Sequence, residues 1–161
     1  MTSNLYQILY CSRNCMHGTA TENELEITKI LASSRRNNVK LDVTGALLFN
    51  TVFFAQVLEG PLSGVEKIFE SIQRDIRHSD LIVLQSGHVP ERNFPIWSMA
   101  FAGVYSEASY PSIAATLDAA FSKTCDASVA GMEVLALLRS IVVQEEAWAL
   151  PNQQPCEVIL A

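Results

Sequence analysis

Apolar and β-branched residues dominate two neighbouring segments in the first half of the chain, residues 43–49 and 52–58. Only Asn50-Thr51 separates them, so the pattern predicts two strands joined by a hairpin. Along the second strand, Gln56 points to the same side as the apolar residues two positions away, because side chains alternate between the faces of a sheet. Gln56 therefore lies either on a solvated face, as many glutamines do, or in the interior, where its amide needs hydrogen-bond partners.

Periodicity predicts further strands and two helices around this hairpin. The strands are Leu5–Cys11, Leu81–Val89 and Ile96–Ala102, and the helices run from Thr21 to about Asn38 and from Ser63 to about residue 73. The pairs Thr21–Glu24 and Ser63–Glu66 have the spacing of capping boxes at the helix starts. Towards its end the first helix changes from apolar residues to Ser34, Asn37 and Asn38. These polar residues either cap a fraying helix end or face the polar edge of a ligand.

The predicted order is βαββαβ followed by one more strand, which is a ferredoxin-like α+β fold with a fifth strand. Both helices are then expected on one face of a single mixed sheet, where Tyr10 and Gln56 meet in the middle. The opposite face is also apolar, at Leu9, Phe53 and Val57. An exposed apolar face of this size needs a cover.

The rest of the chain offers two helices for this cover, at about residues 111–121 and 127–146. The second carries an apolar stripe of Val129, Met132, Leu135, Leu138 and Val142, which is typical of a helix with one buried side. We expect it to lie on the sheet face opposite the first two helices. The predicted domain organisation is therefore residues 1–105 as one domain and residues 106–161 as a helical extension, with a loose tail from Ala149.

Composition narrows the possible classes of protein. The chain has 161 residues, of which 49% are hydrophobic and 17% charged, and a net charge of −6. This balance indicates a globular protein and argues against nucleic-acid and anionic-membrane partners. We expect no signal peptide and no membrane span, because the start lacks a basic segment and no apolar run reaches ~18 residues. The cysteines have no CxxC spacing, which favours reduced thiols in the cytoplasm and no metal site.

Five stretches of the chain carry a resemblance to a known family. They are YQILYCS, SSRRNN with VTGALLF, FFAQVLEG, IQRDIRHSD and FPIWSMAF. In this order and spacing they resemble the BLUF domain, a blue-light sensor that uses FAD. The resemblance covers about residues 4–105, and the downstream helices are similar to the extension of short, stand-alone BLUF proteins.

The resemblance implies a flavin, FAD with FMN also possible, held between the two helices. It implies that Tyr10 is the photoactive tyrosine, that Gln56 lies between it and the flavin, and that Asn38 binds the carbonyl edge of the ring. The other cofactor-binding residues expected are Ile30, Ser34, Asn37, Phe54, Ile72, Asp75, Arg77 and His78. Trp97 and Met99 match the pair that relays the signal.

One position departs from the family pattern. Ser71 stands where several members carry a basic or imidazole side chain, at a contact to the flavin tail. FMN therefore stays beside FAD as an expected cofactor.

The implied function is a photoreceptor and not an enzyme. Light would move an electron and a proton from Tyr10 through Gln56, and the rearranged hydrogen bonds would alter a protein–protein interaction. The chemistry suits these residues, because a phenol with a pKa near 10 keeps its proton in the dark and a glutamine both donates and accepts.

No segment after residue 105 resembles an output enzyme, so an unknown signalling partner or a homo-oligomer is expected to carry the output. Two other classes stay open, a flavin-dependent redox enzyme and a ferredoxin-like interaction module that binds no ligand.

Overall fold

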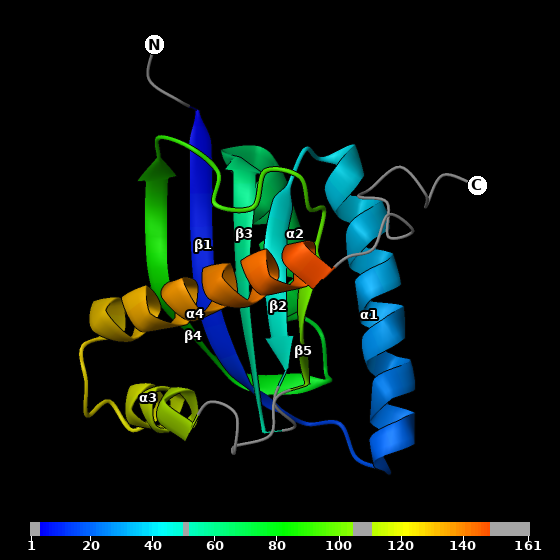
Figure 1. Cartoon of the computed structure of the whole chain (residues 1–161), viewed down its shortest axis with the longest axis vertical. Coiled ribbons are helices and arrows are strands. Elements are labelled where there is room, and N and C mark those ends of the chain that lie inside the picture. The colour runs from blue at the N-terminus through cyan, green and yellow to red at the C-terminus, as the bar shows by residue number, and fades with distance from the viewer. Residues whose placement is uncertain (1–3, 50–51, 105–110, 149–161) are drawn as a thin grey trace.

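The computed structural model describes residues 4–49, 52–104 and 111–148 (Figure 1). Its elements are β1 (Leu5–Asn14), α1 (Ala20–Lys40), β2 (Thr44–Phe49), β3 (Phe53–Pro61), α2 (Leu62–Gln73), β4 (His78–Val89), β5 (Ala100–Val104), α3 (Pro111–Phe121) and α4 (Ala127–Trp148). This order confirms the predicted α+β class. The predicted Asn50-Thr51 connection and the predicted loose tail from Ala149 lie outside the described residues.

The strands form one mixed sheet in the order β4-β1-β3-β2-β5. Neighbouring strands are antiparallel except β2 and β5, which are parallel. The central pair, β1 and β3, sets Tyr10 directly opposite Gln56. Because directly opposed residues project to the same face, this register confirms the predicted meeting of the two side chains.

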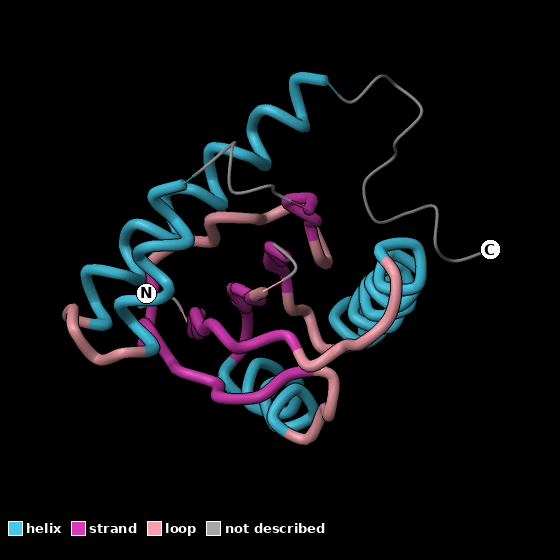
Figure 2. The backbone as a smooth tube through the Cα atoms, turned by 90° about the horizontal axis from the view of Figure 1, so that it is seen from below, coloured by secondary structure: helices cyan, strands magenta, loops and turns pink. Residues whose placement is uncertain are grey.

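Helices cover both faces of the sheet, as the view along its edge shows (Figure 2). On one face the α1–α2 cluster is formed by buried Ile8, Ile27, Leu31, Val43, Leu47, Phe49, Phe54, Leu58, Val65 and Met99. On the other face the α3–α4 cluster includes buried Leu9, Cys11, Ala46, Phe53, Ala55, Val57, Phe94, Leu117, Val134 and Leu138. The predicted placement of the two C-terminal helices opposite the first two is therefore confirmed.

The helix starts differ from the predicted capping boxes. α1 is capped by Thr19, whose hydroxyl accepts from the Glu22 N–H at 3.2 Å while the Glu22 carboxylate accepts from the Thr19 N–H at 2.7 Å. The predicted Thr21–Glu24 box is wrong by two residues. α2 follows β3 directly, with Pro61 at its N-cap and no side-chain cap, so the predicted Ser63–Glu66 box is also wrong.

The last strand is shorter and later than predicted, and the fourth begins earlier. β5 begins at Ala100, where its parallel pairing with Ala46 of β2 starts, whereas the sequence predicted 96–102. The residues before it are irregular, and the Gly45 N–H donates to the Trp97 carbonyl at 3.0 Å. Trp97 packs against the α3–α4 cluster and Met99 is buried in the α1–α2 cluster. Alternation along the predicted strand Ile96–Ala102 would put both side chains on one face, and this prediction is wrong.

The covering helix α4 runs across the strands (yellow to orange in Figure 1), and the predicted stripe is only partly the side that it buries, since Leu138 is buried and Leu135 packs against the α3–α4 cluster. Val129 and Met132 are 52% and 65% exposed, and the Val142 side chain lies outside the described side chains. The buried residues are Ala130, Gly131, Val134 and Leu138. A Cβ at Gly131 would lie 2.6 Å from Cγ of Gln85, so the helix approaches β4 by its small residues.

Candidate functional site

A cavity of about 430 Å³ lies between α1, α2 and the sheet. This volume falls within the roughly 300–1,000 Å³ typical of small-molecule sites. Every cofactor-binding residue expected from the sequence lines it, namely Tyr10, Ile30, Ser34, Asn37, Asn38, Phe54, Gln56, Ile72, Asp75, Arg77 and His78. Residues from six different segments thus converge on one pocket, because the helices cross the sheet where β1 and β3 are paired.

Tyr10 and Gln56 form a buried polar pair in this pocket. The Tyr10 hydroxyl donates a hydrogen bond to Oε1 of Gln56, and the two side chains are only 3% and 4% exposed. Burial, and to a lesser extent the carboxylate of Asp75, raises the pKa of the Tyr10 phenol above its usual value. The phenol therefore keeps its proton at neutral pH and can only act as a neutral donor.

The other end of the Gln56 amide faces a sulfur atom. Nε2 of Gln56 lies 3.4 Å from Sδ of Met99, just before β5. A thioether is a weak acceptor, so this contact holds the amide less strongly than the phenol does. The two ends of one buried amide thus connect the middle of β1 to the segment that leads into β5.

Asn38, in the last turn of α1, has one satisfied and one unsatisfied group. Its Nδ2 donates to the Ser98 carbonyl at 2.7 Å, which fixes the orientation of the amide. Its Oδ1 is buried and has no hydrogen-bond partner among the described residues. A buried acceptor without a partner costs about 1–3 kcal/mol, so a ligand that brings an N–H group to Oδ1 would bind favourably there.

The two helices supply apolar walls. Ile30 of α1 and Ile72 of α2 both line the cavity and both pack against the α1–α2 cluster. Leu47 and Phe54 line it from β2 and β3. Aliphatic walls with a few polar groups between them suit a flat ring that carries donors and acceptors on its edge.

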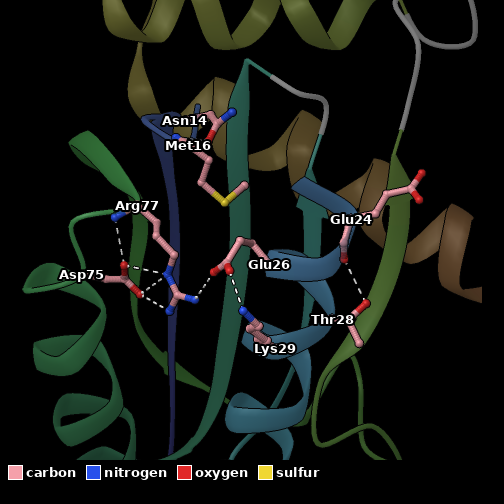
Figure 3. A network of polar contacts seen from close by, with 8 residues as sticks. All are labelled: Asn14, Met16, Glu24, Glu26, Thr28, Lys29, Asp75 and Arg77. Atoms are coloured by element: carbon pink, nitrogen blue, oxygen red, sulfur yellow. Dashed lines mark hydrogen bonds and ion pairs between the residues drawn. The ribbon is translucent and has the colours of Figure 1, made fainter. Parts of the chain in front are cut away.

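Charged residues gather at the end of α2, where Figure 3 shows the Arg77 guanidinium between two carboxylates. Nε of Arg77 lies 2.9 Å from Oδ1 of Asp75, and Nη2 lies 2.5 Å from Oδ2. Nη1 also lies 3.6 Å from the Glu26 carboxylate on α1. Hydrogen bonds from Arg77 lower the pKa of Asp75, so this carboxylate is ionised at neutral pH. The ion pairs link α1 to the turn before β4.

His78 lines the pocket with both ring nitrogens already engaged. Nε2 lies 2.6 Å from the Ile72 carbonyl, which can only accept, so Nε2 carries a proton. Nδ1 lies 2.7 Å from the Ser12 hydroxyl. The imidazole therefore positions the end of α2 against β1 and contributes a ring face to the pocket.

Some lining residues were not singled out as site residues by the sequence. They are Ser33, Lys40, Leu41, Leu47, Lys67 and Ile68, while Ser71, expected only as a departure from the family pattern, also lines the cavity. Lys67 lies one helical turn before Ser71, a spacing that could have indicated it. Of the predicted relay pair, Met99 contacts Gln56, whereas Trp97 is absent from the pocket lining.

The described part of the chain contains neither a membrane-spanning helix nor a cluster of metal-ligating side chains. None of its helices has the length and hydropathy needed to cross a bilayer. Within the same residues, no group of three or more histidine, cysteine, aspartate or glutamate side chains is placed to hold a metal ion.

The fold and the pocket together define a ferredoxin-like ligand-binding domain that has a phenol–amide pair beside its ligand space. A family model described as "Sensors of blue-light using FAD", or BLUF, matches residues 5–100. The chain belongs to this family of flavin-binding blue-light sensors.

Solved BLUF structures share this fold. The dark-state structure of BlrB superposes with a TM-score of 0.66 at 28% identity, over 90% of this chain and 99% of that one. Klebsiella pneumoniae BlrP1 with FMN and cyclic diGMP gives a TM-score of 0.54 at 30% identity, over 60% of this chain and 25% of that one. The photo-activated state of BlsA, at 22% identity and a TM-score of 0.64, supports the fold alone.

Curated relatives are much longer than the match. A photoactivated adenylate cyclase subunit beta of Euglena longa is 29% identical over 110 residues, which is 68% of this chain and 12% of that protein. The blue light- and temperature-regulated antirepressor BluF of Escherichia coli is 39% identical over 69 residues, 43% of this chain and 17% of that protein. The chain thus spans less than a fifth of the length of these relatives in the matched region.

Proposed function

We propose that this protein is a blue-light photoreceptor that works by electron and proton transfer between Tyr10, Gln56 and a flavin in the α1–α2 pocket. The observation that carries the proposal is the buried hydrogen bond from the Tyr10 hydroxyl to Gln56 within that pocket. FAD is the cofactor in the family description, and FMN is named with BlrP1. Both share the ring that the pocket would hold.

The residues present fit a flavin. The unpaired Oδ1 of Asn38 would accept a hydrogen bond from the ring N–H, and Ile30 and Ile72 would contact the two ring faces. Ser34, Asn37 and Phe54 would line the remaining edge, and Asp75, Arg77 and His78 would lie beside its polar end. A flavin would therefore satisfy the one buried acceptor that the pocket leaves without a partner.

The bound flavin supplies absorption of blue light and, once excited, the capacity to accept one electron. Tyr10 would supply that electron, and its hydroxyl proton would leave through Oε1 of Gln56, because the phenol already donates to this atom. When the electron and the proton return, Tyr10 would regain its starting state and the Gln56 amide would be left rotated or tautomerised. Atoms and electrons balance over the cycle, and the protein gains no covalent bond.

The changed amide would alter the contact with Met99. In the present arrangement Nε2 of Gln56 faces Sδ of Met99, and a rotated amide would set its oxygen against the sulfur. Because an oxygen and a thioether both accept, that contact would be lost and the segment before β5 would shift. Trp97, two residues earlier, would carry the shift to the α3–α4 face.

Output is proposed to pass through protein contacts. Residues 1–105 would form the sensor and residues 106–161 a helical extension, since the family model ends at residue 100 and α4 packs against β5. Relatives named as cyclase subunits and an antirepressor are in keeping with a signalling role. The partner would be another signalling protein or a second copy of this chain.

An absorption spectrum before and after blue light tests the proposal. The flavin-loaded protein should be yellow, shift reversibly to the red under blue light and return in the dark. Failure to bind any flavin would favour a ferredoxin-like interaction module, and substrate turnover without a shift would favour a redox enzyme. Size-exclusion chromatography with light scattering, in darkness and in blue light, would then show whether the output is a change of oligomer.

A further inference from the structure

Glu59 is a fully buried carboxylate on β3, on the sheet face opposite Gln56. Its side chain is 0% exposed, although an unpaired buried charge would be strongly destabilising. Its oxygens accept from the Gln7 amide at 3.0 Å, the Asn93 N–H at 2.8 and 2.9 Å, the Asn93 amide at 2.8 Å and the Phe94 N–H at 3.0 Å. Most of these donors belong to the loop between β4 and β5.

Arg92 strengthens the same attachment. Its Nη1 donates to the Glu59 carbonyl at 3.1 Å and to the Thr44 hydroxyl at 3.0 Å, and its Nη2 donates to the Asp42 carbonyl at 2.9 Å. One guanidinium thus donates to backbone carbonyls of β3 and of the residues before β2. We call residues 92–94 the Glu59 anchor. They are held to the sheet by the carboxylate of Glu59 and by the guanidinium of Arg92.

The segment that follows the anchor is short and ends beside the Tyr10–Gln56 pair. Its Trp97 and Ser98 carbonyls accept from Gly45 and Asn38, and its Met99 sulfur faces Gln56. Trp97 lies on one face of the sheet and Met99 on the other. Residues 95–99 therefore connect the fixed anchor with the contact that the proposed mechanism disturbs.

We propose that Glu59 is a positioning residue for signal transmission, which holds residues 92–94 so that a change at Gln56 moves residues 95–99 and not the whole loop. The inference rests on the proposed photochemistry for the origin of the signal. It adds a residue that touches neither the pocket nor Gln56. A loop attached at one end can transmit a local displacement, whereas a loop free at both ends relaxes and loses it.

Amide hydrogen exchange of the flavin-loaded, full-length Glu59→Gln variant tests the anchor, with Glu91→Gln as the control. Glu91 is exposed and lies in the same loop. In Glu59→Gln an NH₂ group replaces one acceptor, so the Asn93 and Phe94 amides should exchange at least about tenfold faster in the dark than in the control. Exchange within twofold of the control would overturn the anchor.

Illumination tests the transmission. Glu59→Gln should keep the full red shift, because Glu59 lies across the sheet from Gln56, and should lose at least about half of the light-induced change in exchange at residues 97–99. An undiminished light-induced change at these residues would overturn the proposal. Absence of a red shift in the wild-type protein would instead contradict the proposed function, while the dark comparison would still report on the anchor.

A second variant protects the test against misfolding. Asn93→Ala removes only the side-chain donor at 2.8 Å and leaves the backbone donors in place. It should raise dark exchange of the Phe94 amide about threefold and reduce the light-induced change at residues 97–99 in proportion. Unchanged values for both quantities would overturn the proposal even if Glu59→Gln did not fold.

Discussion

The two faces of the sheet are both apolar, but they are filled differently. In the α3–α4 cluster the side chains of Leu9, Val57, Leu117, Val134 and Leu138 are all 0% exposed and contact one another. On the α1–α2 face a cavity of about 430 Å³ remains, with Tyr10, Asn38 and Gln56 around it. Close contact on one face supplies stability, whereas the other face leaves space for a ligand.

Adjacent residues of the same strand contribute to the two different faces. Leu9 and Tyr10 are neighbours on β1, and Gln56 and Val57 are neighbours on β3, yet each pair divides between the two faces. Because side chains alternate, one strand serves both faces. Substitutions one residue apart should therefore separate photochemistry from stability, and the following predictions test that separation.

The largest expected effect is at the pocket. Tyr10→Phe should abolish the light-induced red shift, because the electron donor is lost, while the protein still binds flavin through the rest of the pocket. Tyr6→Phe is the matched control, since Tyr6 lies on the same strand and face but outside the pocket lining. Difference spectra measure the result, and a normal shift in Tyr10→Phe would exclude this residue from the mechanism.

A cavity created in the α3–α4 cluster should have the opposite effect, lowering stability and leaving the photochemistry unchanged. Leu138→Ala should lower the free energy of unfolding by about 2–5 kcal/mol, because it removes buried methyl groups from the α3–α4 cluster. The red shift should stay the same under conditions where the protein is folded. Urea denaturation checks the first part, with exposed Met132→Ala as the control, which should change stability by less than about 0.5 kcal/mol. Equal losses in both variants would contradict the assigned burial of α4.

Asn38→Ala should weaken flavin binding and leave the other face unaffected. It removes the unpaired buried acceptor Oδ1 together with the bond to the Ser98 carbonyl. The expected loss of about 1–3 kcal/mol corresponds to a roughly 5- to 150-fold higher flavin Kd. Quenching of flavin fluorescence measures the Kd, and an unchanged value would show that Asn38 does not contact the ring.

The α3–α4 cluster should also make the stability of the protein depend on pH in the alkaline range. Burial raises the pKa of the Cys11 thiol to about 12, whereas the unfolded thiol titrates near its usual value of about 8.5. Between these values the unfolded chain binds fewer protons, so stability from this group is complete below about pH 8.5 and is lost as pH rises towards 12.

Cys11→Ala should flatten this dependence. The slope of unfolding free energy against pH should decrease by up to about 1.4 kcal/mol per pH unit relative to wild type. Urea denaturation at a series of pH values measures it. Cys15→Ala, at a partly exposed site, should keep the wild-type slope, and an equal effect of both variants would contradict the explanation.

The smallest effect is expected where α1 meets the end of α2. Glu26→Gln should remove one ion pair to Arg77, which keeps its hydrogen bonds to Asp75. Because these groups are partly exposed, flavin Kd should rise by less than about fivefold, and the difference should shrink in high salt. Titrations at two salt concentrations check this, with Glu24→Gln as the control. A large, salt-independent loss would mean that Glu26 contacts the flavin itself.

Local sequence pattern was sufficient for the strand faces, and the resemblance to the BLUF family was needed for most of the pocket. Alternation placed Tyr10 and Gln56 on one side and Leu9 and Val57 on the other, because a strand allows no other arrangement of neighbouring side chains. The resemblance supplied Ile30 and Ile72, which both line the cavity. The family resemblance added the polar residues, and the structure brings all of them to the same cavity.

Other features depended on contacts between segments far apart in the chain. The phase of α4 could not be read from periodicity, because the helix is apolar on several sides and Gly131 lies against Gln85 of β4. The separation of Trp97 from Met99 follows from an irregular segment held by Gly45 and Asn38. A pattern within one segment contains no information about such partners.

The sequence by itself therefore determined the class of fold, the two-faced strands and most of the residues around the pocket. Only the tertiary structure decided how Glu59 is satisfied, since its donors Asn93 and Phe94 lie 34 and 35 positions away. It also decided which acceptor is left without a partner, because the Asn38 amide is oriented by the Ser98 carbonyl. Periodicity indicates the buried side of an element that is apolar on one side only, whereas hydrogen-bond partners depend on how the elements meet.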